Sequence, residues 1–187
     1  MNPAELAIHE EPIERLDEHA EISIAFLVER ILAVSLLEDG LGGVRLIETS
    51  IASPWIKDYD AIKGEGPTRW LKRFDTSGWG LIAAYDSDAR IGGAVVALGL
   101  ELDRAILWDL RVRPEYRSSG VGSSLFRAVE EWSRSKGCRS LKVETQNVNL
   151  AACHFYVRMG CELGSIDRFA YPDLPDETQL LWIKSLV

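Results

Sequence analysis

Hydrophobic and polar positions along the first hundred residues predict strands joined by turns. Apolar residues at alternate positions across residues 22–34 favour a long strand, although the apolar residues between them also fit a helix. The turn-rich DGLGG of residues 39–43 leads to an apolar run at 44–51, so these segments predict a β-hairpin. Residues 79–85 and 91–100 predict a second hairpin around a polar turn.

The second part of the chain alternates between strand and helix patterns. Residues 107–112 predict an apolar strand, and residues 120–136 place apolar side chains at helical spacing. Residues 140–145 again alternate like a strand, and Asn149 is positioned to cap a short helix over residues 150–159. A strand, helix, strand order requires a crossover, which places the two strands side by side and parallel or nearly so.

The remaining segments predict shorter elements. Residues 11–19 predict a short helix, since Pro12 is tolerated in a first turn. Residues 53–73 predict a loop with two short helices, and residues 161–171 and 178–186 predict strands that close the sheet. The fold class that follows is α/β (α+β), with a mixed, mostly antiparallel central sheet and flanking helices.

A glycine-rich turn links the strand at 107–112 to the following helix. Its sequence is RSSGVG, residues 117–122, and several backbone N–H groups of such a turn point at one place, a site suited to a phosphate or diphosphate. No lysine follows the glycines, which excludes a P-loop, and the third glycine of a dinucleotide-binding fingerprint is missing. The alternative is an ordinary strand–turn–helix whose glycines serve packing.

Two motifs in this region carry a resemblance to a known family. The R-x-x-G-x-G of residues 117–122 resembles motif A of the GNAT superfamily of acetyl-CoA-dependent N-acetyltransferases, and the N-x-x-A-x-x-F-Y of residues 149–156 resembles its motif B. The resemblance implies a GNAT-like sheet in which a parallel strand pair splays apart, and acetyl-CoA as co-substrate. It assigns cofactor binding to Leu110, Arg111, Val112, Arg117, Ser118, Ser119, Gly120, Val121, Gly122, Ser123, Asn149, Ala152, Phe155 and Tyr156.

A closer likeness lies in residues 143–156, VETQNVNLAACHFY, which is similar to streptothricin acetyltransferases and their relatives. This likeness covers residues 106–187. The chain departs from that pattern at Ser118, where the family usually has glycine, and at Cys161, which replaces phenylalanine. A serine still donates its backbone N–H, so neither change should abolish cofactor binding.

Acetyl transfer to an amine requires an oxyanion donor, a proton acceptor and an acid for the departing thiolate. Backbone N–H groups at the end of the 107–112 strand are expected to serve the oxyanion, and the resemblance makes Tyr156 the candidate acid. Asp109 and Glu144 are candidate bases, and the alternatives are binding of a cationic substrate or pairing with Arg111 and Lys142. Aromatic rings and carboxylates suit a cationic acceptor, which makes Trp55, Asp58, Tyr59 and Trp108 candidate acceptor-binding residues, together with Asp60 and Trp70. A place in the core or in a solvent-exposed loop would explain each of these residues equally well.

The resemblance implies direct transfer of an acetyl group to a primary amine of a small cationic molecule, such as a streptothricin-like antibiotic. Two alternatives are a protein or peptide amine as acceptor, and a non-catalytic module that binds acyl-CoA. The net charge of −8 disfavours nucleic acid as a partner and favours a cationic acceptor.

Length and composition set the remaining expectations. The 187 residues fit one domain, 1–187, with a hairpin extension at about 11–51 and a cofactor-binding core at about 79–187. No signal-peptide pattern or apolar run of about 20 residues occurs, so a cytoplasmic location without membrane contact is expected. Three cysteines without metal-ligand spacing predict free core thiols and no metal. Edge strands near the C-terminus are compatible with a homodimer.

Overall fold

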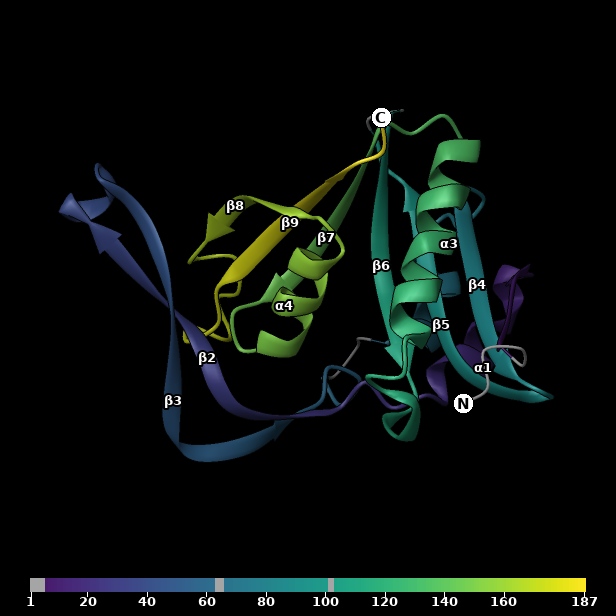
Figure 1. Cartoon of the computed structure of the whole chain (residues 1–187), viewed down its shortest axis with the longest axis horizontal. Coiled ribbons are helices and arrows are strands. Elements are labelled where there is room, and N and C mark those ends of the chain that lie inside the picture. The colour runs from purple at the N-terminus through teal and green to yellow at the C-terminus, as the bar shows by residue number, and fades with distance from the viewer. Residues whose placement is uncertain (1–5, 63–65, 101–102) are drawn as a thin grey trace. The chain divides into compact units, whose positions relative to one another are not determined.

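The computed structural model describes residues 6–62, 66–100 and 103–187, and the chain forms two compact units (Figure 1). The first unit comprises Met1–Ala25, Asp58–Val143 and Lys184–Val187. The second comprises Phe26–Lys57 and Glu144–Ile183.

The first unit is built on a sheet with the strand order β1-β4-β5-β6-β7. Neighbouring strands are antiparallel except β6 and β7, which are parallel. The second predicted hairpin and the predicted parallel pair are therefore confirmed. Strand β1 was not predicted, because its six residues include too few apolar positions to show a period. The strands are β1 (Leu6–Glu11), β4 (Trp79–Asp86), β5 (Ala89–Leu98), β6 (Arg104–Val112) and β7 (Ser140–Gln146), whose last residues belong to the second unit.

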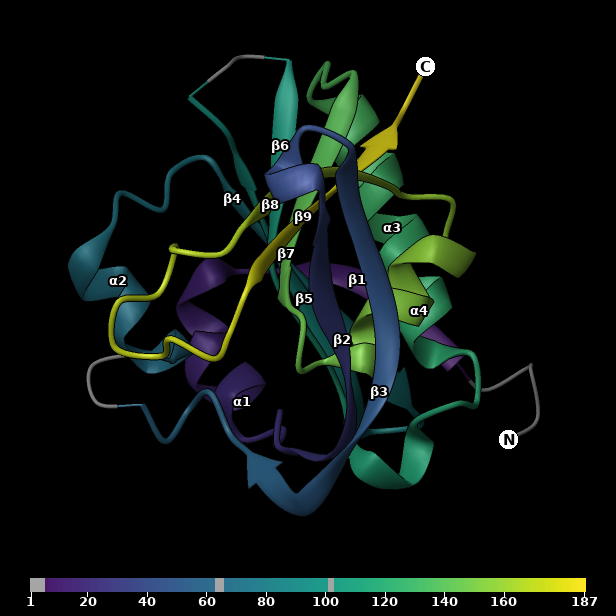
Figure 2. The same ribbon diagram turned by 90° about the vertical axis from the view of Figure 1, so that its left-hand side faces the viewer.

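Helices lie on both faces of this sheet. Helix α3 covers one face of β4, β5 and β6, and α1 lies on the other (Figures 1 and 2). The helix predicted over 11–19 begins later, because Glu11 ends β1 and Pro12, with a ψ of 135°, is still extended. The bounds are η1 (Ile13–Arg15), α1 (Leu16–Ala20), η3 (Pro67–Arg69), α2 (Trp70–Arg73), η4 (Pro114–Tyr116) and α3 (Val121–Ser135).

Two adjacent glycines on β5 allow both helices to approach closely. Successive strand residues face opposite sides of a sheet, so Gly92 faces α3 and Gly93 faces α1. A Cβ atom on Gly92 would lie 3.0 Å from Leu125, and one on Gly93 would lie 2.5 Å from the Nδ1 atom of His19. A side chain at either position would force the packed helix away from the sheet.

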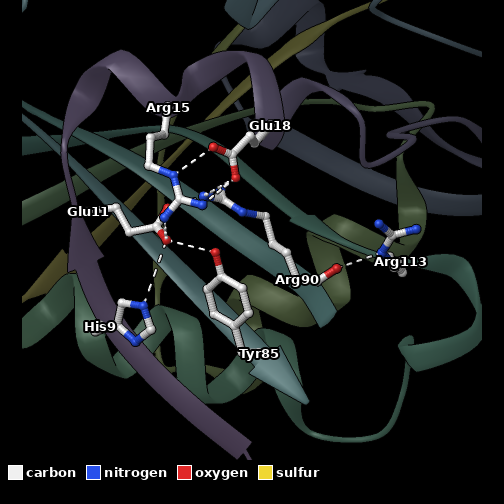
Figure 3. A network of polar contacts seen from close by, with 7 residues as sticks. All are labelled: His9, Glu11, Arg15, Glu18, Tyr85, Arg90 and Arg113. Atoms are coloured by element: carbon white, nitrogen blue, oxygen red, sulfur yellow. Dashed lines mark hydrogen bonds and ion pairs between the residues drawn. The ribbon is translucent and has the colours of Figure 1, made fainter. Parts of the chain in front are cut away.

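Strand β1 is tied to the sheet through the buried carboxylate of Glu11, which Figure 3 shows at the centre of a polar network. This carboxylate accepts hydrogen bonds from Arg15, Arg90 and, at 2.7 Å, from the Tyr85 hydroxyl. Arg15 also pairs with Glu18. Because removal of one partner would leave buried charge uncompensated, the network fixes β1 against β4 and β5.

The second unit contains the predicted N-terminal hairpin, formed by β2 (Phe26–Leu37), η2 (Glu38–Gly40) and β3 (Gly43–Lys57). The prediction of a loop from residue 53 is wrong for 53–57. Strand β3 continues there because Trp55 and Ile56 pair with Val28 and Leu27, while Pro54 falls in an irregular stretch of the ladder, where proline is tolerated.

Helix α4 (Leu150–Arg158) and the antiparallel pair β8 (Glu162–Asp167) and β9 (Gln179–Ser185) complete the second unit, apart from the last residues of β9. The strand predicted over 161–171 ends at Asp167. Beyond it, residues 168–178 form turns that contain Pro172 and Pro175. The predicted fold class, a mostly antiparallel mixed sheet with one parallel pair and flanking helices, is confirmed.

Candidate active site

The turn before α3 has the geometry of an anion-binding site. Ser118 and Gly120 both adopt positive φ angles, 63° and 97°. The first helical hydrogen bond of α3 runs from the Ser124 N–H to the Gly120 carbonyl, and no side chain caps the helix. The N–H groups of Val121, Gly122 and Ser123 therefore have no acceptor within the helix.

Space beside this turn is open, since a Cβ atom on Gly120 would meet no atom within 4 Å. Convergent N–H groups at a helix N-terminus with open space beside them fit a diphosphate, the charged group of acetyl-CoA. The backbone residues predicted for cofactor binding at 118–123 are thus brought together.

The Arg117 side chain, also predicted for cofactor binding, forms hydrogen bonds within the first unit. Its guanidinium donates hydrogen bonds to the carbonyls of Val112 (3.1 Å), Ser23 (2.8 Å) and Ala25 (3.0 Å). The arginine therefore shapes the turn by holding the end of β6 and the segment after α1. Its positive charge remains beside the turn.

Strand β6 changes its pairing halfway along its length. The parallel ladder with β7 comprises the pairs from Arg104 with Ser140 to Leu107 with Val143, whereas β6 runs on to Val112. The pairing of β6 with β5 shifts at the next residue, Trp108, and a bulge of this kind bends a strand. A ladder that stops at a bulge is the arrangement expected of a splayed strand pair.

This shift leaves donors on one edge of β6. The Arg113 N–H donates to Ile91 of β5, and N–H directions alternate along a strand. The N–H groups of Leu110 and Val112 therefore point away from β5. Both residues were predicted for cofactor binding, and such fixed donors can stabilise a developing oxyanion without reorganisation.

Asp109, a candidate base, lies in a buried cluster of charged groups. It accepts a hydrogen bond of 2.6 Å from Arg111, and the Nε2 atom of His19 lies 3.5 Å from the same oxygen. Burial opposes its ionisation, but the His19 ring and the positive charge of Arg111 lower the pKa of Asp109 below its ordinary value. Of the alternatives left open by the sequence, the structure contains the ion pair with Arg111.

Arg111 extends the cluster to the segment after residue 57. It binds both carboxylate oxygens of Asp60, with one distance of 2.9 Å, and donates to the Ile22 carbonyl at 3.2 Å. The Asp60 N–H in turn donates to the side chain of Asp58. Asp58, Tyr59 and Asp60 are thus held near the end of β6, and the arginine side chain serves this positioning.

The other candidate acceptor residues, Trp55, Trp70 and Trp108, have different surroundings. Trp108 packs with Trp70, Phe74 and Trp79, with ring centroids 4.7–5.9 Å apart. Trp55 lies on β3 in the second unit and is 40% exposed.

In the second unit, the motif B residues lie on α4. The side-chain oxygen of Asn149 accepts the Ala152 N–H at 3.1 Å, which confirms the predicted helix cap. Tyr156 is buried and its ring packs edge-on against Phe155, with centroids 5.2 Å apart. His154 is exposed and pairs with Glu48 at 2.7 Å.

Glu144, the second candidate base, differs from Asp109 in being exposed. It accepts a hydrogen bond of 2.6 Å from the hydroxyl of Tyr171, which itself accepts one of 2.8 Å from Gln146. Burial and the Glu144 carboxylate raise the pKa of Tyr171, so the phenol stays protonated at neutral pH. Sequence reasoning missed Tyr171; the only local signal was an aromatic residue in the acidic, proline-containing segment YPDLPDE.

Three further observations concern the cysteines, groups of metal-ligating side chains and the lengths of the helices. Cys138, Cys153 and Cys161 are free and buried. Across residues 6–62, 66–100 and 103–187, no group of three or more His, Cys, Asp or Glu side chains has the geometry of a metal site. Over the same ranges, no helix is long and apolar enough to span a membrane.

Comparison with known proteins decides the family. The model of the acetyltransferase (GNAT) family matches residues 47–161, which include the turn before α3 and all of α4. The chain belongs to the GNAT family.

Several of its relatives within the GNAT family are named streptothricin acetyltransferases. Streptothricin acetyltransferase of Escherichia coli is 27% identical over 172 residues, 90% of either chain. Streptothricin acetyltransferase A of Bacillus subtilis (strain 168) is 34% identical over 80 residues, which are 42% of this chain and 46% of that protein. A candidate streptothricin acetyltransferase of Bacillus anthracis str. Ames, crystallised with acetyl coenzyme A, matches with a TM-score of 0.78 and 24% identity over 96% of this chain and 99% of that one.

These findings confirm the family and the enzyme class. The protein is an acetyl-CoA-dependent acetyltransferase of the GNAT family. Acetyl-CoA is its co-substrate, and the turn before α3 supplies N–H groups of the kind that a diphosphate requires.

Proposed function

We propose that this GNAT enzyme transfers an acetyl group directly from acetyl-CoA to a primary amine of a small cationic molecule, in the manner of a streptothricin-modifying enzyme. The observation that carries this proposal is the likeness to E. coli streptothricin acetyltransferase over 90% of both chains. The net charge of −8 supports it, because a negative field attracts a cationic acceptor.

The roles proposed for the first unit follow from its backbone donors. Acetyl-CoA supplies the acetyl group as a thioester. The N–H groups of Val121, Gly122 and Ser123 bind the diphosphate. Those of Leu110 and Val112 donate hydrogen bonds to the thioester oxygen as it gains negative charge. One such donor typically lowers the activation free energy by about 3 kcal/mol.

The two proton transfers, from the attacking amine and to the departing thiolate, are assigned to Glu144 and Tyr156. Glu144 accepts the proton of the attacking amine, directly or through a water, and this choice over Asp109 rests on exposure. Asp109 is buried, paired with Arg111 and has a lowered pKa, so it is a poor proton acceptor and acts instead in positioning. Tyr156 is proposed as the acid for the departing thiolate, from its match to the motif B tyrosine.

The acceptor class is tested by measuring CoA thiol release from acetyl-CoA with streptothricin, other polyamines, neutral amines of similar size and basic peptides. We expect the highest kcat/KM with a small cationic amine. A clear preference for peptides would favour the protein-acceptor alternative, and binding of acetyl-CoA without transfer to any amine would favour a binding module.

The proton-transfer roles are tested with two variants. Tyr156→Phe and Glu144→Gln should each lower kcat by about 100-fold or more, the range of general acid and base catalysis, with acetyl-CoA affinity retained. His154→Ala on α4 and Glu162→Gln on β8 are matched controls, since both side chains are exposed. A Tyr156→Phe enzyme with the native kcat would overturn the assigned acid.

A further inference from the structure

A cavity in the second unit has no role in the mechanism described so far. Its volume is about 570 Å³, which is enough for a small organic ligand. Strand β2 forms one wall and the segment between β8 and β9 forms the other. The lining residues are Ile31, Ala33, Val34, Asn147, Arg168, Phe169, Tyr171, Pro172, Pro175, Asp176 and Thr178.

The two walls of this cavity are fixed to each other by the buried side chain and backbone of Asn147. Its main chain bonds the Leu32 N–H (2.9 Å) and the Thr178 carbonyl (3.0 Å). Its amide side chain bonds the Leu32 carbonyl (3.0 Å) and the Thr178 N–H (2.8 Å). With all four hydrogen bonds made, the cavity is formed before any ligand arrives.

Tyr171 connects the cavity to the proposed base. Its ring lines the cavity, while its hydroxyl donates to Glu144 at 2.6 Å and accepts from the Gln146 amide at 2.8 Å. One side chain therefore contacts both the ligand space and the carboxylate that is proposed to take the amine proton. A phenol held from two sides fixes the orientation of that carboxylate.

The charge around the cavity favours a cation. Residues 167–178 carry four carboxylates, Asp167, Asp173, Asp176 and Glu177, and one basic residue, Arg168. Lys57 pairs with Glu177, so three carboxylates remain against the charge of Arg168. The lining residues include one carboxylate, Asp176, and one guanidinium, Arg168, which lies over the Phe169 ring at 5.7 Å. Tyr171 adds a second aromatic ring, and such rings attract cations through their quadrupole. Ile31 and Ala33 add an apolar surface for carbon atoms between the charges.

We propose that this cavity binds a cationic part of the amine acceptor that does not react, and that Tyr171 is a positioning residue linking the bound acceptor to Glu144. The proposal rests on the proposed function and deepens it by naming the site that recognises the acceptor. Binding energy from a remote part of the substrate would then hold the reacting amine in place.

The first test compares two aspartates of the same segment. Asp176→Asn should lower kcat/KM for streptothricin about tenfold, the typical effect of one charge-assisted contact, and leave the KM for acetyl-CoA unchanged. Asp173→Asn is the matched control, because Asp173 is exposed and does not line the cavity. Equal effects of the two substitutions would overturn the proposal in favour of a general electrostatic effect.

The second test concerns Tyr171. Tyr171→Phe should lower kcat for streptothricin about tenfold and leave its KM within twofold, because Glu144 loses the hydrogen bond that orients it for proton transfer. A thermal unfolding scan establishes that the variant is folded. A folded Tyr171→Phe enzyme with the native kcat and native KM would show that Tyr171 has a purely structural role.

A binding measurement separates failure of this inference from failure of the proposed function. Isothermal titration of streptothricin into the acetyl-CoA-free protein should give a Kd that Asp176→Asn weakens and Asp173→Asn does not. If the native protein acetylates streptothricin but Asp176→Asn binds it equally well, the cavity assignment is wrong. If native protein neither binds nor acetylates any cationic amine, the proposed function fails and this inference with it.

Discussion

The starts of α3 and α4 differ in what happens to the N–H groups of the first turn, which have no acceptor within the helix. Asn149 caps α4 by accepting the Ala152 N–H, so the donor is satisfied by the protein itself. Helix α3 begins after Gly120 with no side-chain cap, and its first N–H groups remain available. Because every helix start leaves donors without helical acceptors, the missing cap at α3 leaves these N–H groups available to an external anion.

The charge of the chain sharpens this comparison. A protein with a net charge of −8 repels an anionic cofactor at long range. Attraction must therefore come from local groups, the N–H donors of the turn and the nearby charge of Arg117. At α4, by contrast, Asn149 already accepts the Ala152 N–H.

The largest effect is expected where a negative charge is placed in the uncapped turn. Gly120→Asp introduces a carboxylate beside the N–H donors and a side chain at a φ of 97°, a conformation that favours glycine. We expect acetyl-CoA affinity to fall by at least 100-fold in a titration followed by calorimetry.

A control for this variant is Gly137→Asp, at a φ of 81° after the end of α3, where a Cβ atom also meets nothing within 4 Å. It carries the same backbone strain and the same added charge at the opposite end of the helix. Comparable loss of acetyl-CoA affinity in both variants would mean that the turn has no specific role.

A smaller effect is expected at the capped helix. Asn149→Ala removes the acceptor of the Ala152 N–H and should lower the free energy of unfolding by about 1 kcal/mol, measured by urea titration. Acetyl-CoA affinity should change less than threefold, because the amide oxygen is already used within α4. A tenfold loss of affinity would instead indicate that Asn149 contacts the cofactor, as the family resemblance implies.

The sequence predicted the bounds of these two helices well, but it did not predict the surroundings of the carboxylates Asp109 and Glu144. The starts of α3 and α4 are determined by local chemistry, a glycine turn and an Asn cap, so both could be located within one or two residues. Whether Asp109 or Glu144 can accept a proton depends on partners distant in sequence. His19 and Asp60 approach the Asp109–Arg111 pair, and Tyr171 approaches Glu144, only in the folded chain.

The same limit explains the missed parts of the fold and the cavity. Strand β1 is held by Arg90 and Tyr85, which lie some eighty residues further along the chain, and its own six residues carry little pattern. The cavity is joined by Asn147, which bonds Leu32 on one side and Thr178 on the other. An asparagine in a sequence gives no indication of four such partners.

The smallest expected effect lies in the turn itself, at the position where this chain departs from the family's usual glycine. Ser118 adopts a φ of 63°, and a non-glycine residue in this left-handed region is strained by about 1 kcal/mol or more. Ser118→Gly relieves that strain, but glycine also raises the conformational entropy of the unfolded chain. This second effect lowers the free energy of unfolding by roughly 0.5–1 kcal/mol. We therefore expect a gain in unfolding free energy of at most about 1 kcal/mol. Acetyl-CoA affinity should stay within twofold, since a glycine keeps the same N–H. A fivefold loss of affinity on this substitution would show that the Ser118 hydroxyl, and not the backbone alone, binds the cofactor.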